Sequence, residues 1–293
     1  MARHCAPHTR AEEQFLHDNE FRQDNHSHHR CAIQASLRAT CWCWHPTHSD
    51  QLPGANSGLG FEVAKNLSFY SASYHVIIAS RDIAKGEVAV EALAKDPGLK
   101  GTVSAVQLDV TDDASVDAAA ESVKQLHGRL DVLINNAGIF MRGEPRQVAR
   151  NIFATNVVGY ISVTEAFLPL MCEAPAPRLI FLSSSLGSLS NASDPSSAYY
   201  SPLGAEYRAA TAARNMLMNQ YWVRLQQSYP GKFKVHGADP GLNATNLADT
   251  PDQLRNRGAV EPYVGGERVA SVARGDRDSD VGRVCGVYGV SPW

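Results

Sequence analysis

From residue 59 onward, two patterns of apolar residues alternate along the chain: short continuous runs, and a spacing of three or four positions. Short apolar runs are typical of buried strands, and apolar residues spaced by three or four positions are typical of helices. The short apolar runs predict strands at Tyr74–Ala79, Thr102–Leu108, Leu130–Ile134, Arg178–Leu182, Lys234–Gly237 and Val284–Tyr288. The spacing of three or four predicts helices at Leu59–Leu67, at Ile83–Lys95, in a segment capped by Asp112, at Arg146–Met171 and at Glu206–Gln227.

Strands that alternate with helices predict an α/β fold, a doubly wound, Rossmann-like parallel sheet with helices on both faces. In this fold, ligands bind beyond the carboxyl ends of the strands, where the strand order reverses. No internal repeat or second core is visible. We therefore expect one domain over residues 46–293, preceded by a polar, Cys/His-rich extension over residues 1–45 that is poorly structured or not the natural start of the protein.

The segment before Gly54 departs from this pattern. The fold needs a central apolar strand there, but His45–Pro53 contains two prolines and almost no apolar residues. Ala39–Trp44 has some strand character, yet it needs a long loop to reach Gly54. Either this poor surrogate strand fills the central slot, or the first fifty residues are not the true start. We favour the second explanation and treat the first strand as not recognisable.

Cysteine and histidine gather in the same N-terminal region. Two clusters, His26–His29 and Cys41–His48, offer the thiolate and imidazole groups that zinc prefers. The familiar zinc frameworks separate paired cysteines by two to four residues, and that spacing does not recur here. We predict no metal site, and metal analysis of the purified protein distinguishes a zinc-binding module from a polar extension.

Composition narrows the classes of function. The net charge of −3 and the near-neutral balance of charges provide no basic surface for nucleic acid. No run approaches the roughly 18 apolar residues that span a bilayer, and Met1–Arg10 lacks the apolar centre of a signal peptide. We expect a soluble, cytoplasmic protein whose partner is a small molecule, with no nucleic acid or membrane partner.

The clearest motif is the glycine turn before the first predicted helix. In Gly54-Ala55-Asn56-Ser57-Gly58-Leu59-Gly60, the first glycine permits a tight bend and the second lets the backbone approach a phosphate. The amides at the start of the helix then face an anion. Three glycines alone also occur in ordinary loops, so the prediction of a dinucleotide site depends on further motifs later in the chain.

Ser80-Arg81 ends the next predicted strand. An acidic residue there would bind the ribose hydroxyls of NAD and repel a 2′-phosphate, whereas a guanidinium binds phosphate strongly. The alternative is a solvated surface arginine. We predict NADP as the cofactor.

Further motifs come in a fixed order. They are Asn135-Asn136-Ala137-Gly138, Asn156, Ser183-Ser184-Ser185-Leu186-Gly187, Tyr207 on a helix, and Pro240-Gly241 with Thr245. With the G-x-x-x-G-x-G turn, this ordered set resembles the classical short-chain dehydrogenase/reductase family from Gly54 to Trp293.

The resemblance implies hydride transfer between NADP(H) and a small carbonyl or secondary alcohol. Tyr207 would be the acid/base, Ser184 would hydrogen-bond the substrate oxygen, and Asn156 would anchor a proton-relay water. It also implies cofactor contacts from Asp109, Val110, Asn136, Ala137, Gly138, Pro240, Gly241 and Thr245. Because Ser184 and Tyr207 are further apart than is usual in the family, Asn191–Ala205 is expected to be an inserted loop beside the substrate cleft.

One residue departs from the family pattern at the predicted active site. The family has lysine four residues after the tyrosine, and this chain has Thr211. A phenol without help titrates near pH 10, so Tyr207 would be a reluctant base, although it can still donate its proton. Arg214 can lend charge, but it lies two helical turns from Tyr207, which favours a surface or interface position.

The sequence therefore leaves two functions open. Ser184, Tyr207, Asn156 and Thr245 favour an NADP-dependent oxidoreductase, weakened or not. Thr211 and the missing first strand favour an inactive relative that binds NADP or a partner protein. Homo-oligomers formed through two long helices are common in the family, and an Arg214 side chain at that interface would disfavour them.

Overall fold

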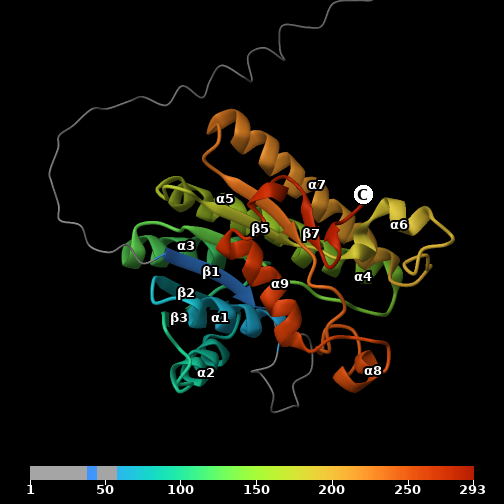
Figure 1. Cartoon of the computed structure of the whole chain (residues 1–293), viewed down its shortest axis with the longest axis horizontal. Coiled ribbons are helices and arrows are strands. Elements are labelled where there is room, and N and C mark those ends of the chain that lie inside the picture. The colour runs from blue at the N-terminus through green and yellow to red at the C-terminus, as the bar shows by residue number, and fades with distance from the viewer. Residues whose placement is uncertain (1–37, 45–57) are drawn as a thin grey trace, which may run out of the picture. The chain divides into compact units, whose positions relative to one another are not determined.

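The computed structural model describes residues 38–44 and 58–293 (Figure 1). The chain divides into two units, Met1–Ala35 and Ser36–Trp293, and only the second contains described residues. The His26–His29 cluster lies outside the described residues. Of the Cys41–His48 cluster, only the backbone of residues 41–44 is described.

Eight strands form a single sheet in the order β3-β2-β1-β4-β5-β6-β7-β8 within the described part of the chain. Their bounds are β1 Arg38–Trp44, β2 Tyr74–Ser80, β3 Thr102–Gln107, β4 Val132–Asn135, β5 Arg178–Leu182, β6 Lys234–Ala238, β7 Val284–Gly286 and β8 Gly289–Val290. The first seven are parallel, and β8 turns back on β7 as an antiparallel partner. The strand order reverses between β1 and β4, so the predicted doubly wound α/β fold is confirmed.

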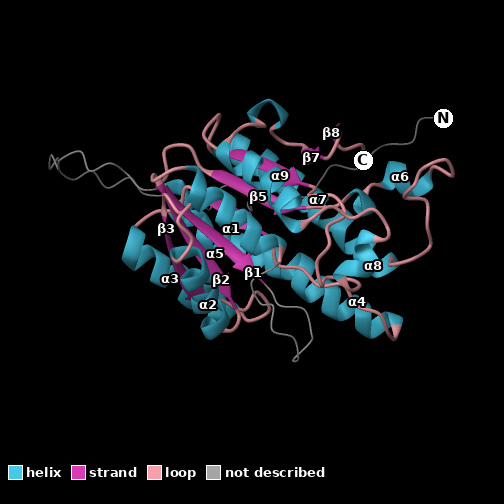
Figure 2. Ribbon diagram, turned by 60° about the horizontal axis from the view of Figure 1, so that its bottom comes forward, coloured by secondary structure: helices cyan, strands magenta, loops and turns pink. Residues whose placement is uncertain are grey.

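The expectation that the first strand is missing was wrong. Arg38–Trp44 pairs along its length with β2 from Arg38↔Tyr74 to Trp44↔Ser80, and it pairs with β4 at Thr40↔Val132. The strand runs through the middle of the sheet (Figure 2). Its Thr, Cys and Trp residues suit a strand, and it ends two residues before Pro46. The surrogate strand therefore fills the slot, and the domain begins before residue 46.

Two layers of helices cover the sheet (Figure 1). α1 (Leu59–Tyr70), α2 (Ile83–Ala94) and α9 (Pro262–Arg274) pack on one face. α3 (Asp113–His127), α5 (Gly159–Cys172) and α7 (Ala205–Ser228) pack on the other. Side chains alternate along β2, with Val76 and Ile78 facing the first layer and Ile77 and Ala79 facing the second.

The predicted helix Arg146–Met171 is interrupted. α4 (Pro145–Phe153) continues through a π-helical turn, Ala154–Val158, into α5. By length and composition the whole segment Pro145–Cys172 is apolar enough to cross a membrane, with a mean hydropathy of 1.2 in its most apolar window, which the sequence pattern had not indicated. Tyr160, Val163 and Phe167 on this segment are buried in the core against the sheet.

Three helices were not predicted: α6 (Leu189–Ser193), α8 (Pro251–Arg255) and α9. α6 and α8 lie at the end of the molecule to which the strand arrows point (Figure 2). In α9, the pair Gly265-Gly266 disfavours a helix in isolation. Both glycines are needed for packing, because a Cβ on Gly266 would lie 2.6 Å from the Glu62 Cβ of α1.

Candidate functional site

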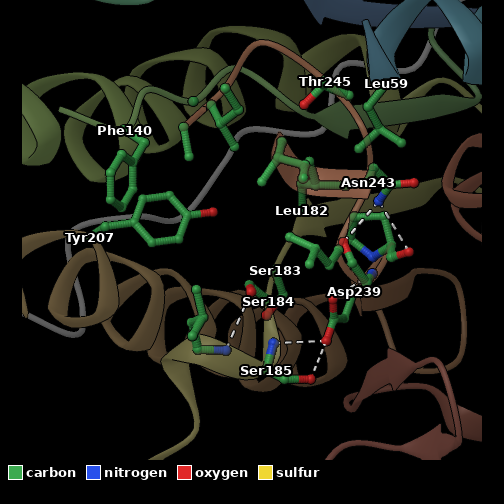
Figure 3. A pocket seen from close by; sticks show the side chains of 18 of the residues that line it. Leu59, Phe140, Leu182, Ser183, Ser184, Ser185, Tyr207, Asp239, Asn243 and Thr245 are labelled. Carbon is green, nitrogen blue, oxygen red and sulfur yellow. Dashed lines mark hydrogen bonds between the residues drawn. The ribbon is translucent and has the colours of Figure 1, made fainter. Parts of the chain in front are cut away.

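A cavity of about 660 Å³ opens at the carboxyl ends of the strands (Figure 3). Ten of the residues predicted for the site line it: Gly58, Leu59, Gly60, Asn136, Gly138, Ser184, Tyr207, Pro240, Gly241 and Thr245. Ser80, Arg81, Asp109, Val110, Ala137 and Asn156 do not line it, and Gly54, Asn56 and Ser57 lie outside the described residues. The structure thus brings most of the predicted site into one cavity.

One end of the cavity is formed by the start of α1. Gly58 is the N-cap residue of this helix, and it has no side chain that could cap the first turn. The amide groups at the start of a helix lack intrahelical partners and carry positive partial charge. The start of α1 therefore suits a phosphate at the cavity wall.

The segment after β2 contributes one residue, Lys85, to the same cavity. The Ser80 hydroxyl is buried and donates to the Asp82 carbonyl oxygen at 2.7 Å, while the Asp82 carboxylate caps α2 by accepting from Ala84 N at 3.0 Å. Arg81 is half-buried. Lys85, one turn into α2, lines the cavity and was not predicted. Its sequence signal was a cation four residues after Arg81, on the helix that follows the strand.

Asn156 supports the loop after β4 from behind. Its side chain is fully buried in the π-helical turn, where Oδ1 accepts from Ile139 N at 2.8 Å and Nδ2 donates to Ile139 O at 2.9 Å. These two bonds fix the backbone next to Gly138, which lines the cavity. Single-turn π-helices often occur at functional sites, and this one orients Asn156.

The turn after β5 carries Ser184, whose Oγ accepts from Leu186 N at 3.3 Å. The next residue, Ser185, donates its backbone N–H to Asp239 Oδ2 at 2.7 Å, and Asp239 Oδ1 accepts from Gly241 N at 2.9 Å. Asp239 is buried and joins the β5 turn to the β6 turn (Figure 3). Sequence reasoning missed this residue, although it directly precedes the Pro240-Gly241 motif.

Gly241 has a backbone conformation that favours glycine, with φ of +78°. A Cβ there would lie 2.7 Å from Nη1 of Arg268, which donates to Pro240 O at 2.7 Å. The bend carries the chain from β6 along the cavity to Thr245.

Tyr207 lies in the first turn of α7. Its ring packs against Phe140 with 5.5 Å between ring centroids, and its hydroxyl points into the cavity (Figure 3). Gly187 lets the β5 turn approach α7 closely, because a Cβ at that position would lie 2.6 Å from Thr211 Cγ2. The serine-bearing turn and the tyrosine-bearing helix are therefore held together by the absence of a side chain at Gly187.

Arg214 lies inside the site, so its expected position at the surface or an interface was wrong. Its side chain is 2% exposed and lines the cavity. Nη2 donates to Thr211 Oγ1 at 2.8 Å, and Nη1 donates to the Tyr160 hydroxyl at 3.1 Å. The guanidinium carbon lies 5.9 Å from the centroid of the Tyr207 ring. Two helical turns separate Arg214 from Tyr207 along α7, but a long side chain spans this distance.

The segment before α7 closes one side of the cavity, as expected of an insertion beside the cleft. Ala198, Tyr199, Ser201 and Leu203 line it, although the start of the segment forms the short helix α6 rather than a loop. Asp249, which also lines the cavity, accepts from Arg142 Nη2 and from Arg257 Nη1, each at 3.0 Å. These pairs join the loop after β4 to the region of α8.

Known proteins resemble this chain over most of its length. The sequence model of the family "short chain dehydrogenase" matches residues 52–254. The short-chain dehydrogenase/reductase tropE of Talaromyces stipitatus is 36% identical over 251 residues, covering 79% of this chain and 92% of the relative. The short-chain dehydrogenase/reductase eupG of a Phoma species is 32% identical over 270 residues, covering 83% and 96%.

Solved structures share the fold. An NADPH-bound carbonyl reductase from chicken fatty liver superposes with a TM-score of 0.69 at 24% identity, covering 88% of this chain and all of the other. Salutaridine reductase from Papaver somniferum superposes with a TM-score of 0.63 at 23% identity, covering 80% and 95%.

Proposed function

Because this chain belongs to the short-chain dehydrogenase/reductase family and has an NAD(P)-binding Rossmann fold, we propose that it is an NADPH-dependent reductase of a small carbonyl compound. The observation that carries the proposal is the common cavity. It joins the uncapped start of α1 to the hydroxyl groups of Ser184 and Tyr207. A dinucleotide needs the first feature and an acid/base step needs the second.

The residues that follow β2 support NADPH rather than NADH. Arg81 and Lys85 place two cations by the end of β2, and Asp82 directs its carboxylate oxygen to Ala84 N. A 2′-phosphate binds favourably to guanidinium and ammonium groups. The phosphate at the start of α1 and the 2′-phosphate beside Arg81 would anchor the adenosine half of the cofactor.

Each residue around the reacting carbonyl has a separate role. When bound, NADPH supplies the hydride. Ser184 would hydrogen-bond the carbonyl oxygen, and Tyr207 would donate its phenolic proton to that oxygen as the alcohol forms. Asn156 acts one layer behind, since its two bonds to Ile139 hold the loop that carries Gly138.

The lining beyond Tyr207 favours an apolar substrate skeleton. Phe140, Leu186, Tyr199 and Leu203 line the cavity together with Tyr207, and Ser184, Ser201 and Arg208 are polar lining residues from the same segments. Apolar walls with a small number of placed polar groups are typical of small-molecule sites.

A panel of aldehydes and ketones with apolar skeletons tests the proposal by NADPH oxidation. We expect turnover in the wild type, and a loss of about 10²–10⁴-fold in Tyr207→Phe. Tyr200→Phe is the matched control, because Tyr200 is exposed and does not line the cavity. NADPH binding without turnover on any substrate would instead support the inactive, cofactor-binding relative that Thr211 alone suggests.

A further inference from the structure

The site contains a cation that its tyrosine motif does not predict. Arg214 is buried, and none of the ion pairs found among residues 58–293 involves it. Its guanidinium lies over two phenol rings, with 5.2 Å to the centroid of Tyr160 and 5.9 Å to that of Tyr207. A buried charge is costly without partners, and among the described residues these two phenols and the Thr211 hydroxyl are the groups that stabilise it.

The pKa of Arg214 reflects this environment. Burial lowers it, but the interactions of the guanidinium with the nearby phenols of Tyr160 and Tyr207 outweigh burial, so the pKa is raised. The guanidinium therefore stays protonated. Electrostatic attraction is mutual, so the cation that the phenols stabilise in turn stabilises negative charge on them.

Thr211 has a supporting role in this arrangement. Its hydroxyl donates to Tyr207 O at 2.8 Å and accepts from Arg214 Nη2 at 2.8 Å. Thr211 is fully buried beneath Gly187, so the guanidinium is directed by a side chain that cannot move away. The residue at the lysine position thus holds the arginine in place.

We propose that Arg214 supplies the positive charge that a lysine at position 211 would supply, and that it stabilises the phenolate of Tyr207 as the proton leaves. The inference rests on the proposed function. The carbonyl gains the hydride at carbon and the Tyr207 proton at oxygen, and the resulting phenolate regains a proton from solvent. Arg214 keeps its own proton throughout and acts as a positioning residue through Tyr207.

Two substitutions separate charge from packing. Arg214→Met keeps a long, apolar side chain and removes the charge, and we expect kcat to fall by about 10²-fold while the KM for NADPH changes little. Arg214→Lys keeps the charge and loses the planar fork, so it should recover most of kcat. Arg224→Met, at an exposed position of the same helix paired with Glu165, is the control and should leave kcat unchanged. Equal losses in the methionine and lysine variants would overturn the proposal.

A second measurement does not depend on turnover. Tyrosinate absorbance of the cofactor-free protein is followed through alkaline pH, and the signal missing from Tyr207→Phe is assigned to Tyr207. Among the described residues, Arg214 from α7 lies over this ring and also over that of Tyr160 from α5, and Arg142, Tyr199 and Arg208 line the same cavity. We expect the assigned signal to arise at higher pH in Arg214→Met than in a protein with Arg214 intact.

The two measurements distinguish a failure of the proposed function from a failure of the role proposed for Arg214. If no carbonyl compound is reduced but the absorbance shift appears, the proposed function is wrong and the role of Arg214 stands. If the wild type reduces a substrate and neither kcat nor the absorbance changes in a folded Arg214→Met, the role of Arg214 is refuted. Circular dichroism and thermal unfolding confirm that each variant is folded. If Arg214→Met does not fold, the wild type is compared with Arg214→Lys instead. The charge role of Arg214 is then refuted if the lysine variant loses about 10²-fold in kcat while its tyrosinate absorbance arises at the same pH as in the wild type.

Discussion

The choice between NADPH and NADH is made by a few side chains at the end of β2. We predict that Arg81→Asp lowers the ratio of kcat/KM for NADPH to that for NADH by at least about 10-fold, because hydrogen bonds to charged groups contribute about 1.5–3 kcal/mol. Steady-state kinetics with both cofactors measures the ratio. Lys100→Asp, an equal charge change at the exposed turn before β3, should leave the ratio unchanged. An equal loss with both cofactors in Arg81→Asp would argue against a 2′-phosphate site.

Residue-level reasoning from sequence predicted which residues line the cavity where a motif fixes the backbone, and the chemical roles of these residues stay predictions. Ser184, Tyr207 and the Pro240-Gly241 bend line the cavity as expected, since each follows a strand or begins a helix. It failed for Arg214, because sequence spacing gives the distance along a helix but not the direction of a long side chain. Asp239 was missed because its two hydrogen-bond partners, Ser185 and Gly241, come from different strand ends.

At the scale of elements, β6 carries a buried histidine that makes stability depend on pH. His236 is fully buried and its Nε2 lies 3.1 Å from Arg277 O. Burial lowers the pKa of His236 to about 4, and the hydrogen bond to Arg277 raises it by less. The folded protein therefore holds this imidazole neutral in a range where the unfolded chain, with a pKa near 6.5, binds a proton.

The contribution of His236 to the free energy of unfolding should consequently be complete above about pH 6.5, and it should be lost as the pH drops towards 4. Within that pH window, His236 alone changes the free energy of unfolding by up to about 1.4 kcal/mol per pH unit. Urea unfolding of the wild type and His236→Leu at several pH values measures it. We expect the variant to lose this part of the slope, and identical slopes would show that His236 does not cause it.

Elements with a clear period were predicted well, and β5 matches its prediction at both ends. Strand β1 was misjudged because Arg38–Trp44 is followed by prolines rather than directly by the glycine turn. Its place comes from pairing with β2 and β4, which no local pattern reveals. Helix α9 was missed because Gly265 and Gly266, unfavourable locally, serve tertiary packing.

For the whole molecule, the position of β1 predicts where the chain can be shortened. A protein that begins at Ser36 keeps all eight strands and should unfold cooperatively. A protein that begins at His45 lacks the central strand and leaves the facing edges of β2 and β4 unpaired, so it should aggregate or lose its cooperative transition. Thermal melts followed by circular dichroism compare the two. Equal melting of both would contradict the assignment of β1.

The arrangement of the whole site connects fold and chemistry. The cavity lies at the strand ends, where the strand order reverses between β1 and β4. Asp239 and Gly187 hold the turns around it together. Helix α7 places Tyr207, Thr211 and Arg214 on one of its faces. We infer that the site keeps a positive charge, on Arg214, although residue 211 is threonine.

Moving the charge tests this claim most directly. Thr211→Lys alone places a second cation beside the buried Arg214, and we expect kcat to fall below that of the wild type. Adding Arg214→Met to Thr211→Lys leaves one cation, at the family position, and should raise kcat above that of either single variant. The same kcat measurement would contradict the account if Thr211→Lys alone increased turnover and Arg214→Met had no effect in either background.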